Sequence, residues 1–366
     1  MAHVRLENIT KKFGSHTALS KLDLEIRNSE FFVLLGPTGA GKTTTLRLIA
    51  GLDSPNGGTI SIDGSDVLNW SAAERDVALV FQYYSLYPHY TVRQNLEFPL
   101  KSKVRRMSEQ EIDARIAKAA KTLRIEHLLE RKTDRLSGGE MQRVSIGRAI
   151  VREPRVFLMD EPLSNLDAKL RELLRAELKD LQMKLGATFL YVTHDQVEAM
   201  SMGDQVGVLN QGRIIQVGTP QEIYNQPHDT FVATFVGSPA MNLMQAHAAG
   251  GRAVVVSGKL EIPLDGAGGG RAVRLSGPVT VGVRSEDIVV DANGTVVARV
   301  HGVENQGVEK VVTLRVDESL LKATVPARLE LGIDTSVKIS FKQEKLQFFD
   351  AGSGVNLFYG DGGKNG

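Results

Sequence analysis

One short stretch constrains the fold of this chain more than any other: GPTGAGKTT, residues 36–44. It fits G-x-x-x-x-G-K-[ST], a pattern that cradles phosphates when it joins a buried strand to a helix. The flanking sequence supplies that setting, because FFVLLG (31–36) is a short apolar run ending in glycine and KTTTLRLIAGL (42–52) has the pattern of a helix. We therefore expect a P-loop nucleotide site within an α/β fold.

The chemistry of the motif assigns a role to most of its positions. Glycines let the backbone wrap around phosphates, Lys42 supplies charge to the β- and γ-phosphates, and the Thr43 hydroxyl is placed to ligate Mg²⁺. Thr44 is expected at the α-phosphate. An ordinary glycine turn before a helix is the alternative, but pattern and context agree on the phosphate cradle. The predicted nucleotide-binding residues of this loop are Gly36, Pro37, Thr38, Gly39, Ala40, Gly41, Lys42, Thr43 and Thr44.

The stretch VFLMDE (156–161) reads as the second half of such a site. Four apolar residues predict a buried strand, and Asp160 at its end can hold Mg²⁺ through water. Glu161 lies one residue further, where it can polarise an attacking water. Taken alone, Glu161 would more often be a solvated surface carboxylate, but its place beside Asp160 favours the catalytic role.

Two other polar residues follow apolar runs. His194 ends TFLYVTH (188–194), and Gln82 follows VALVF (77–81). Ligands of open α/β sheets gather outside the carboxyl ends of the strands, so we expect His194 at the γ-phosphate and Gln82 nearby. A lone histidine is more often structural. The predicted catalytic residues are Glu161, His194, Gln82 and Lys42, and the predicted Mg²⁺ ligands are Thr43, Gln82 and Asp160.

A second small-residue turn precedes a helical pattern in RLSGGEMQRV (135–144). Backbone N–H groups at a helix N-terminus, together with the helix dipole, favour phosphate. Ser137, Gly138 and Gly139 therefore form a second candidate phosphate site, although the P-loop already provides one.

The sequence predicts two domains. In residues 1–235, strand-like and helix-like segments alternate, which indicates a mostly parallel sheet with helices on both faces. An inserted helical subdomain is expected at roughly 84–150, where Ser108 and Glu111 form a possible capping box. After residue 236 the sequence pattern changes to short runs of alternating apolar and polar residues, which predict strands: RAVVVSG, VTVGVRSEDIVV, VVTLRV and VKISF. Residues 236–366 are expected to form a small all-β, barrel-like domain.

Composition removes several classes of function. Lys and Arg total 44 against 43 for Asp and Glu, so no basic excess argues for nucleic acid. Cysteine is absent, which excludes disulfides and thiolate metal sites. The start of the chain, MAHVRLENITKKFG, is not the pattern of a secretory signal, and no run is long and apolar enough to predict a membrane span. If the protein works at a membrane, other chains must cross it.

The motifs GPTGAGKT, Gln82, LSGGE, VFLMDEP, SNLD (164–167) and His194, in this order, resemble the ATPase subunits of ATP-binding-cassette (ABC) transporters. FQYYSLYPHYTVRQN, MDEPLSNLDAKLR, YVTHDQVEAM and GSPAMN resemble the carbohydrate importers among them, such as the maltose importer. VGVRSEDI (281–288) resembles the C-terminal OB-like, TOBE/MOP-type domain of that group.

The resemblance implies ATP and Mg²⁺ as cofactors and a head-to-tail dimer, with a homodimer and a pair of related ATPases both open. Ser137, Gly138 and Gly139 would contact the γ-phosphate held by the other subunit, and Asp167 would link the two sites. Phe13 would stack on adenine, against the alternative of a core phenylalanine. The chain departs from the family pattern at Glu140, where glutamine is commonest, and at Phe13, where tyrosine or tryptophan is more usual.

The resemblance also implies partners and a location. The cluster Tyr83, Tyr84, Tyr87 and Tyr90 would lie in a groove that receives a short helix of a membrane subunit, although some of these rings are expected in a subdomain core. Two membrane-spanning permease subunits, an extracytoplasmic solute-binding protein and a regulatory protein at the C-terminal domain are the expected partners, with no nucleic acid. The protein would sit peripherally on the cytoplasmic face of the inner membrane. The solute, a sugar or a related polyol or glycerol compound, stays open.

Two other classes of ABC-type ATPase fit this sequence less well. ABC-type ATPases that act on DNA or ribosomes usually carry long coiled-coil insertions or two cassettes, and this chain has one cassette and no long heptad run. Export ATPases are commonly fused to membrane spans. The sequence favours the importer ATPase over both.

Overall fold

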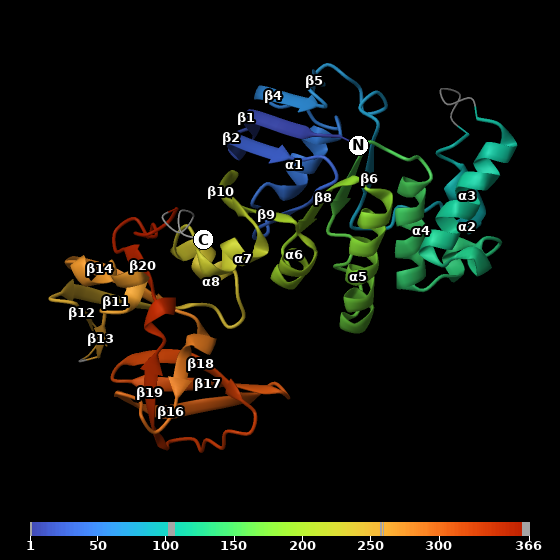
Figure 1. Ribbon diagram of the computed structural model, residues 1–366. Helices are drawn as coiled ribbons and strands as arrows, with labels where there is room; N and C mark the ends of the chain where they lie inside the picture. The colour runs from blue at the N-terminus through green and yellow to red at the C-terminus, as the bar shows by residue number, and fades with distance from the viewer. Residues whose placement is uncertain (1, 102–106, 257, 259, 361–366) are drawn as a thin grey trace. The chain divides into compact units, whose positions relative to one another are not determined.

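The computed structural model describes residues 2–101, 107–256, 258 and 260–360, and the chain divides into two units, Met1–Gln221 and Glu222–Gly366 (Figure 1). Each unit is considered by itself. Residues 102–106 of the expected helical subdomain and 361–366 of the expected β-domain lie outside the described residues.

A mostly parallel sheet carries the nucleotide-site motifs. In the described part of the first unit it has six strands, in the order β10-β9-β3-β8-β7-β6, and only β10 runs antiparallel to its neighbour. The parallel sheet expected from the apolar runs is confirmed. The strands of this sheet are β3 Phe31–Leu35, β6 Val77–Val80, β7 Val156–Asp160, β8 Thr188–Thr193, β9 Gln205–Asn210 and β10 Arg213–Gly218.

A second, antiparallel sheet of the same unit was not expected from the sequence. Its order is β2-β1-β4-β5. Helix α1, Lys42–Ile49, joins the two sheets into one core, because Leu46 and Ile49 belong to the same buried cluster as Leu6 of β1 and Leu34 of β3. The strands of this sheet are β1 Val4–Phe13, β2 His16–Ile26, β4 Gly57–Ile62 and β5 Ser65–Asp66.

Among the described residues, three α-helices lie in the chain between β6 and β7, and two more, which follow β7 and β8, cover the sheet on the face opposite α1. The capping box expected at Ser108 and Glu111 is present, and it starts α3. Helix α5 covers the face that holds Phe31, since Lys179 Nζ lies 5.3 Å from that ring. No described helix is long and apolar enough to cross a membrane. The remaining helices of this unit are α2 Val92–Glu97, α3 Glu109–Leu123, α4 Gly138–Ile150, α5 Ala168–Leu185 and α6 Gln196–Met202.

The second unit is mainly β-structure, as expected. Its described residues form two five-stranded antiparallel sheets, β13-β12-β11-β14-β20 and β15-β19-β16-β17-β18. One buried cluster spans both sheets and includes Val281, Val300 and Phe348. The strands are β11 Asn242–Ala249, β12 Arg252–Val255, β13 Glu261–Pro263, β14 Gly277–Val283, β15 Ile288–Val290, β16 Val296–Asn305, β17 Glu309–Val316, β18 Ser319–Pro326, β19 Ser336–Phe341 and β20 Gln347–Asp350.

The division between the units falls earlier than the predicted boundary at 235/236. The division falls within helix α7, Pro220–Asn225, and α8, Thr230–Phe235, belongs to the second unit. The reason lies in Arg284, whose Nη1 donates hydrogen bonds to the carbonyl oxygens of Ala233 and Val236. Because the end of α8 provides these acceptors to the buried Arg284 guanidinium, α8 packs with the unit that contains Arg284.

Candidate functional site

The P-loop follows β3 and leads into α1, and its glycines are required by its shape. Gly36 lies against β9, where a Cβ atom would meet the carbonyl oxygen of Leu209 at 2.3 Å. Gly41 precedes α1 with φ 109°, a backbone conformation that favours glycine. These glycines therefore let the loop pass close to β9 and turn into α1, where a side chain at Gly36 would collide with the protein itself.

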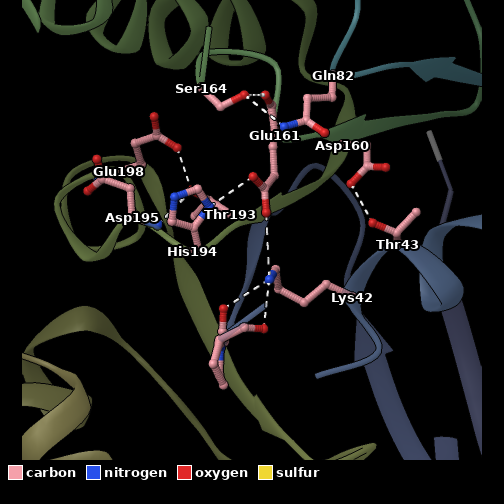
Figure 2. A network of polar contacts seen from close by, with 12 residues as sticks. Lys42, Thr43, Gln82, Asp160, Glu161, Ser164, Thr193, His194, Asp195 and Glu198 are labelled. Atoms are coloured by element: carbon pink, nitrogen blue, oxygen red, sulfur yellow. Dashed lines mark hydrogen bonds and ion pairs between the residues drawn. The ribbon is translucent and has the colours of Figure 1, made fainter. Parts of the chain in front are cut away.

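Lys42 is the buried cation of the site, with 5% of its surface exposed. Its Nζ donates hydrogen bonds to the carbonyl oxygens of Gly36 at 2.9 Å and Pro37 at 3.1 Å, and it lies 3.6 Å from Glu161 Oε1 (Figure 2). Burial lowers the pKa of Lys42, and the nearby Glu161 carboxylate opposes that shift. A lysine held in this way is pre-positioned to exchange its carbonyl contacts for phosphate oxygens.

Thr43 and Asp160 come together from α1 and β7. The Thr43 hydroxyl donates to Asp160 Oδ1 at 3.0 Å. Burial raises the pKa of Asp160, and the hydrogen bond from Thr43 works in the opposite direction. A hydroxyl and a carboxylate are hard oxygen ligands of the kind Mg²⁺ prefers, and Mg²⁺ usually takes only one or two carboxylates besides substrate phosphates. Among the described residues, no group of three or more histidine, cysteine or acidic side chains could hold a metal.

Glu161 and His194 lie at the ends of the adjacent parallel strands β7 and β8. His194 Nδ1 is 2.8 Å from Glu161 Oε2, so Glu161 bonds to His194 with one oxygen and faces Lys42 with the other (Figure 2). Glu161 has φ 44°, in the left-handed region, and its N–H donates to the Val192 carbonyl at 3.0 Å. This turn directs the carboxylate out of the sheet and over the P-loop.

Gln82 reaches the site from the end of β6. Its Nε2 donates to Ser164 Oγ at 3.3 Å, and Ser164 Oγ donates to the carbonyl oxygen of Glu161 at 2.9 Å. Asn165 Nδ2 donates to the Gln82 carbonyl at 3.0 Å. The structure thus ties Gln82 to the segment after Glu161, and sequence reasoning did not single out Ser164 for this link.

These side chains surround one pocket of about 520 Å³. Phe13, half exposed at the end of β1, lines its rim, and Lys11 Nζ lies 4.8 Å from the phenyl ring. Phe13 is therefore a partly exposed residue at the rim of the pocket and not a core residue. The lining residues are Phe13, His16, Ala18, Thr38, Gly39, Gly41, Lys42, Thr43, Thr44, Gln82, Asp160, Glu161 and His194.

The second candidate phosphate loop does not contribute to this pocket. Ser137 is the exposed N-cap of α4, and Glu140 completes a capping box with it. Glu140 Oε2 accepts hydrogen bonds from the Ser137 N–H at 2.7 Å and from the Ser137 hydroxyl at 2.9 Å. The Ser137 N–H holds the pKa of Glu140 below its usual value, so the carboxylate is charged at neutral pH. Arg131 Nη1 lies 3.8 Å from Glu140 Oε1.

Gly138, Gly139 and Asp167 also lie outside the pocket lining. A Cβ atom at Gly139 would meet Leu170 Cδ2 at 2.5 Å, so the glycine lets α4 begin close to α5. Asp167 is the N-cap of α5, and its side chain accepts a hydrogen bond from the Leu170 N–H at 3.0 Å. One copy of the chain therefore places the predicted residues in two groups, a P-loop pocket and a separate exposed loop.

Three family models match the chain. The ABC transporter model matches residues 19–164, the MalK OB fold domain matches 237–288, and the TOBE domain matches 281–349. The first covers the P-loop, Asp160 and Glu161, and the other two cover most of the second unit.

Relatives and solved structures agree with these matches. The trehalose/maltose import ATP-binding protein MalK of Thermococcus litoralis is 45% identical, over 98% of this chain and 100% of its own length. The sn-glycerol-3-phosphate import ATP-binding protein UgpC of Brucella abortus is 48% identical, over 96% of this chain and 98% of its own. A dimeric ATP-binding cassette, solved after hydrolysis with ADP and Pi, is 34% identical over 59% of this chain and 98% of its own, with a TM-score of 0.53.

Proposed function

This chain belongs to the ATPase subunits of ABC importers, and from that premise we propose that two copies close head-to-tail over two ATP molecules. In each site the P-loop pocket of one copy would meet the Ser137–Gly139 loop of the other. The observation that carries the proposal is the separation just described. The pocket holds the cation, the carboxylates and the histidine, whereas the second phosphate loop lies at the N-terminus of α4, with Ser137 exposed, and does not line that pocket. The dimeric state of the solved relative supports the same arrangement.

Within a site, different residues of the chain have different roles in binding and hydrolysis. Lys42 binds the β- and γ-phosphates, and Thr43, Asp160 and Gln82 hold Mg²⁺. When bound, Mg²⁺ neutralises charge on the phosphate oxygens. Glu161 accepts the proton of the attacking water, and His194 holds that carboxylate in place through the 2.8 Å contact. Phe13 stacks on the adenine.

The aromatic segment after Gln82 is the proposed contact for two membrane-spanning subunits. The Tyr87 and Phe98 ring centroids lie 4.6 Å apart, and a cavity of about 700 Å³ is lined by Tyr90, Gln94, Glu97, Phe98, Pro99 and Lys101. Arg148 of α4 covers the Tyr87 ring at 4.7 Å, so a helix docked here would act on the element that begins with Ser137. Replacing Tyr87 and Tyr90 with serine should reduce co-purification of the permease subunits more than it changes ATP hydrolysis by the isolated protein. Unchanged co-purification of a folded variant would exclude this docking site.

The imported solute is proposed from the relatives' names, which specify trehalose or maltose in one case and sn-glycerol-3-phosphate in another. A sugar or a glycerol-type solute, delivered by an extracytoplasmic binding protein, is the class we propose. The protein would then work at the cytoplasmic face of the cell membrane. A regulatory protein is proposed to bind the second unit.

The decisive experiment separates ATP binding from hydrolysis. Glu161→Gln keeps the size of the side chain but removes the base, so hydrolysis should fall by about 10²-fold or more. Nucleotide binding should survive, and a closed dimer should accumulate with MgATP. A distance probe across the interface should accompany size-exclusion chromatography, because the second units could hold a loose dimer.

Ser137→Arg, added to Glu161→Gln, tests the role of the second loop. The bulky cation would occupy the place of the partner's γ-phosphate, so ATP should still bind but closure should stop. Ser108→Arg is the matched control, because Ser108 caps α3 with the same kind of capping box. Closure that persists with Ser137→Arg, or that is lost equally with Ser108→Arg, contradicts the proposed site.

A further inference from the structure

We propose that Glu198, a buried carboxylate on α6, is the positioning residue that aims His194 into the nucleotide pocket. The inference rests on the proposed role of His194 and extends it to a group outside the pocket lining. Glu198 is only 2% exposed. It touches neither the P-loop nor Glu161, so its effect on the reaction would pass through its neighbours.

Glu198 is bonded to the strand that carries His194. Its Oε2 accepts a hydrogen bond from the Thr193 hydroxyl at 2.6 Å and from the Tyr191 hydroxyl at 2.9 Å. Both donors belong to β8, and Thr193 is the last residue of that strand. The carboxylate thus fixes the strand end immediately before His194.

The residue after His194 is fixed by the same network. Thr193 Oγ1 accepts a hydrogen bond from the Asp195 N–H at 2.9 Å. Asp195 in turn caps α6, because its Oδ1 accepts from the Val197 N–H at 2.7 Å and from the Glu198 N–H at 3.3 Å. Figure 2 shows Asp195 and Glu198 on the opposite side of His194 from Glu161, toward which the His194 side chain extends. The His194 side chain is itself 53% exposed, so its direction is set by its two neighbours along the chain and by the Glu161 contact.

A buried carboxylate at position 198 would cost more folding free energy than an apolar side chain if it served packing alone. Burial raises the pKa of Glu198, while hydrogen bonds from Thr193 and Tyr191 oppose the shift. The charged groups that also act on it are Asp195, which raises its pKa, and Arg171, which lowers it. Buried carboxylates are costly unless their hydrogen bonds are made, so the arrangement is best explained by a need to hold the two hydroxyls.

Asp195 extends the network to a second loop. Arg171 Nη1 lies 3.3 Å from Asp195 Oδ2, and Arg171 Nη2 donates to the carbonyl oxygens of Ser164 at 3.3 Å and Leu166 at 3.1 Å. These two carbonyls precede Asp167 in the chain. Glu198 bonds directly to Thr193, whereas this second loop is reached only through Asp195 and Arg171. Removing the Glu198 acceptor should therefore loosen the turn around His194 before it affects the second loop.

The test compares variants that keep or remove the hydrogen bonds. Glu198→Gln retains a carbonyl oxygen that can accept both hydroxyls, whereas Glu198→Leu retains none. Thr193→Ser keeps the hydroxyl, and Thr193→Val removes it at nearly constant volume. ATP hydrolysis by Glu198→Leu and Thr193→Val should fall about tenfold or more in kcat, with the KM for ATP changed less, because a misplaced group costs rate in the chemical step. The Gln and Ser variants should retain most of the rate.

A double variant distinguishes positioning from general damage. If Glu198 acts through His194, adding Glu198→Leu to His194→Ala should lower the residual kcat no further. Met202→Ala is the control, since Met202 is equally buried on α6 and contributes to packing only, so kcat should be retained while the melting temperature falls. If Glu198→Leu does not fold, the Thr193 pair decides the question.

The outcomes separate this inference from the proposed function. Normal kcat in Glu198→Leu or Thr193→Val, together with an impaired His194→Ala, overturns the positioning role and leaves the site intact. A further fall of kcat in the double variant also overturns it. Full turnover by His194→Ala would remove the proposed role of His194, and this inference with it.

Discussion

The two phosphate-facing loops of this protein differ in almost every physical respect. The P-loop surrounds a buried lysine and faces two carboxylates, and Lys42 and Thr43 contact a loop carbonyl and those carboxylates. At the second loop Ser137 is exposed, and its N–H and hydroxyl both donate to Glu140 of the same helix. The first is a preformed pocket, whereas the second is a helix cap in which the two Ser137 donors become available to phosphate only if Glu140 releases them.

The same difference appears in stability. Burial shifts the pKa of Lys42 down and that of Asp160 up, so each charged form is disfavoured in the folded pocket. The capping box at Ser137 stabilises the folded state, since loss of a cap typically costs about 0.5–2 kcal/mol of stability. The pocket thus lowers the free energy of unfolding, and the exposed loop raises it.

The largest expected effect comes from Lys42→Ala, which removes the buried cation. Phosphate release should fall to background, a loss of about 10²-fold or more for a preorganised electrostatic group. Lys184→Ala serves as the control, because Lys184 is an exposed lysine paired with Asp180. Near-normal turnover by Lys42→Ala would show that the pocket is not the hydrolytic site.

Asp160→Asn should separate function from stability. The folded pKa of Asp160 is raised, so its ionised form costs stability at neutral pH, and the cost disappears as pH falls toward the carboxyl's ordinary range. Without nucleotide at pH 7, Asp160→Asn should raise the free energy of unfolding by about 1 kcal/mol, and ATP hydrolysis should drop.

Denaturant unfolding at several pH values checks this sign. The gain from Asp160→Asn should shrink as the solution is acidified. If Asp160→Asn were less stable than the parent at pH 7, the ionised Asp160 side chain would not lower the free energy of unfolding.

The smallest effect is expected at the exposed loop. Glu140→Gln retains a capping box, because glutamine also fits that position, but removes a negative charge where the partner's γ-phosphate would bind. The ATP concentration needed for half-maximal closure should fall about two- to fivefold, the range expected for one exposed charge. Glu111→Gln changes the equivalent box on α3 and should leave closure unchanged. Equal shifts in both variants would assign the effect to helix stability.

The sequence predicted the features that depend on local pattern. The buried runs of β3, β7 and β8 and the Ser108 capping box are confirmed, because each is specified by neighbouring residues. The sheet β2-β1-β4-β5 was missed. Its strands bury one face and carry register shifts, as between Leu6 and Ile9, which weakens the alternation that a sequence shows.

In the candidate site, too, the features specified by local motifs could be predicted, and those that depend on packing could not. The motifs predicted which side chains lie at the pocket, and the contact between Thr43 and Asp160 follows from their places at a helix start and a strand end. The network behind His194 could not be read from the sequence. Glu198 looks like any polar residue of a helix, and its burial depends on how α6 packs against β8.

The placement of α8 with the second unit bears on how the protein can be cut. Arg284 is 4% exposed, and its guanidinium donates to carbonyl oxygens of Tyr224, Ala233 and Val236 and lies over the Tyr224 ring at 4.0 Å. Proteolysis after Phe235 would remove most of those acceptors and leave a cation in an apolar setting. A fragment that begins before α7 should refold alone, whereas one that begins at residue 236 should aggregate.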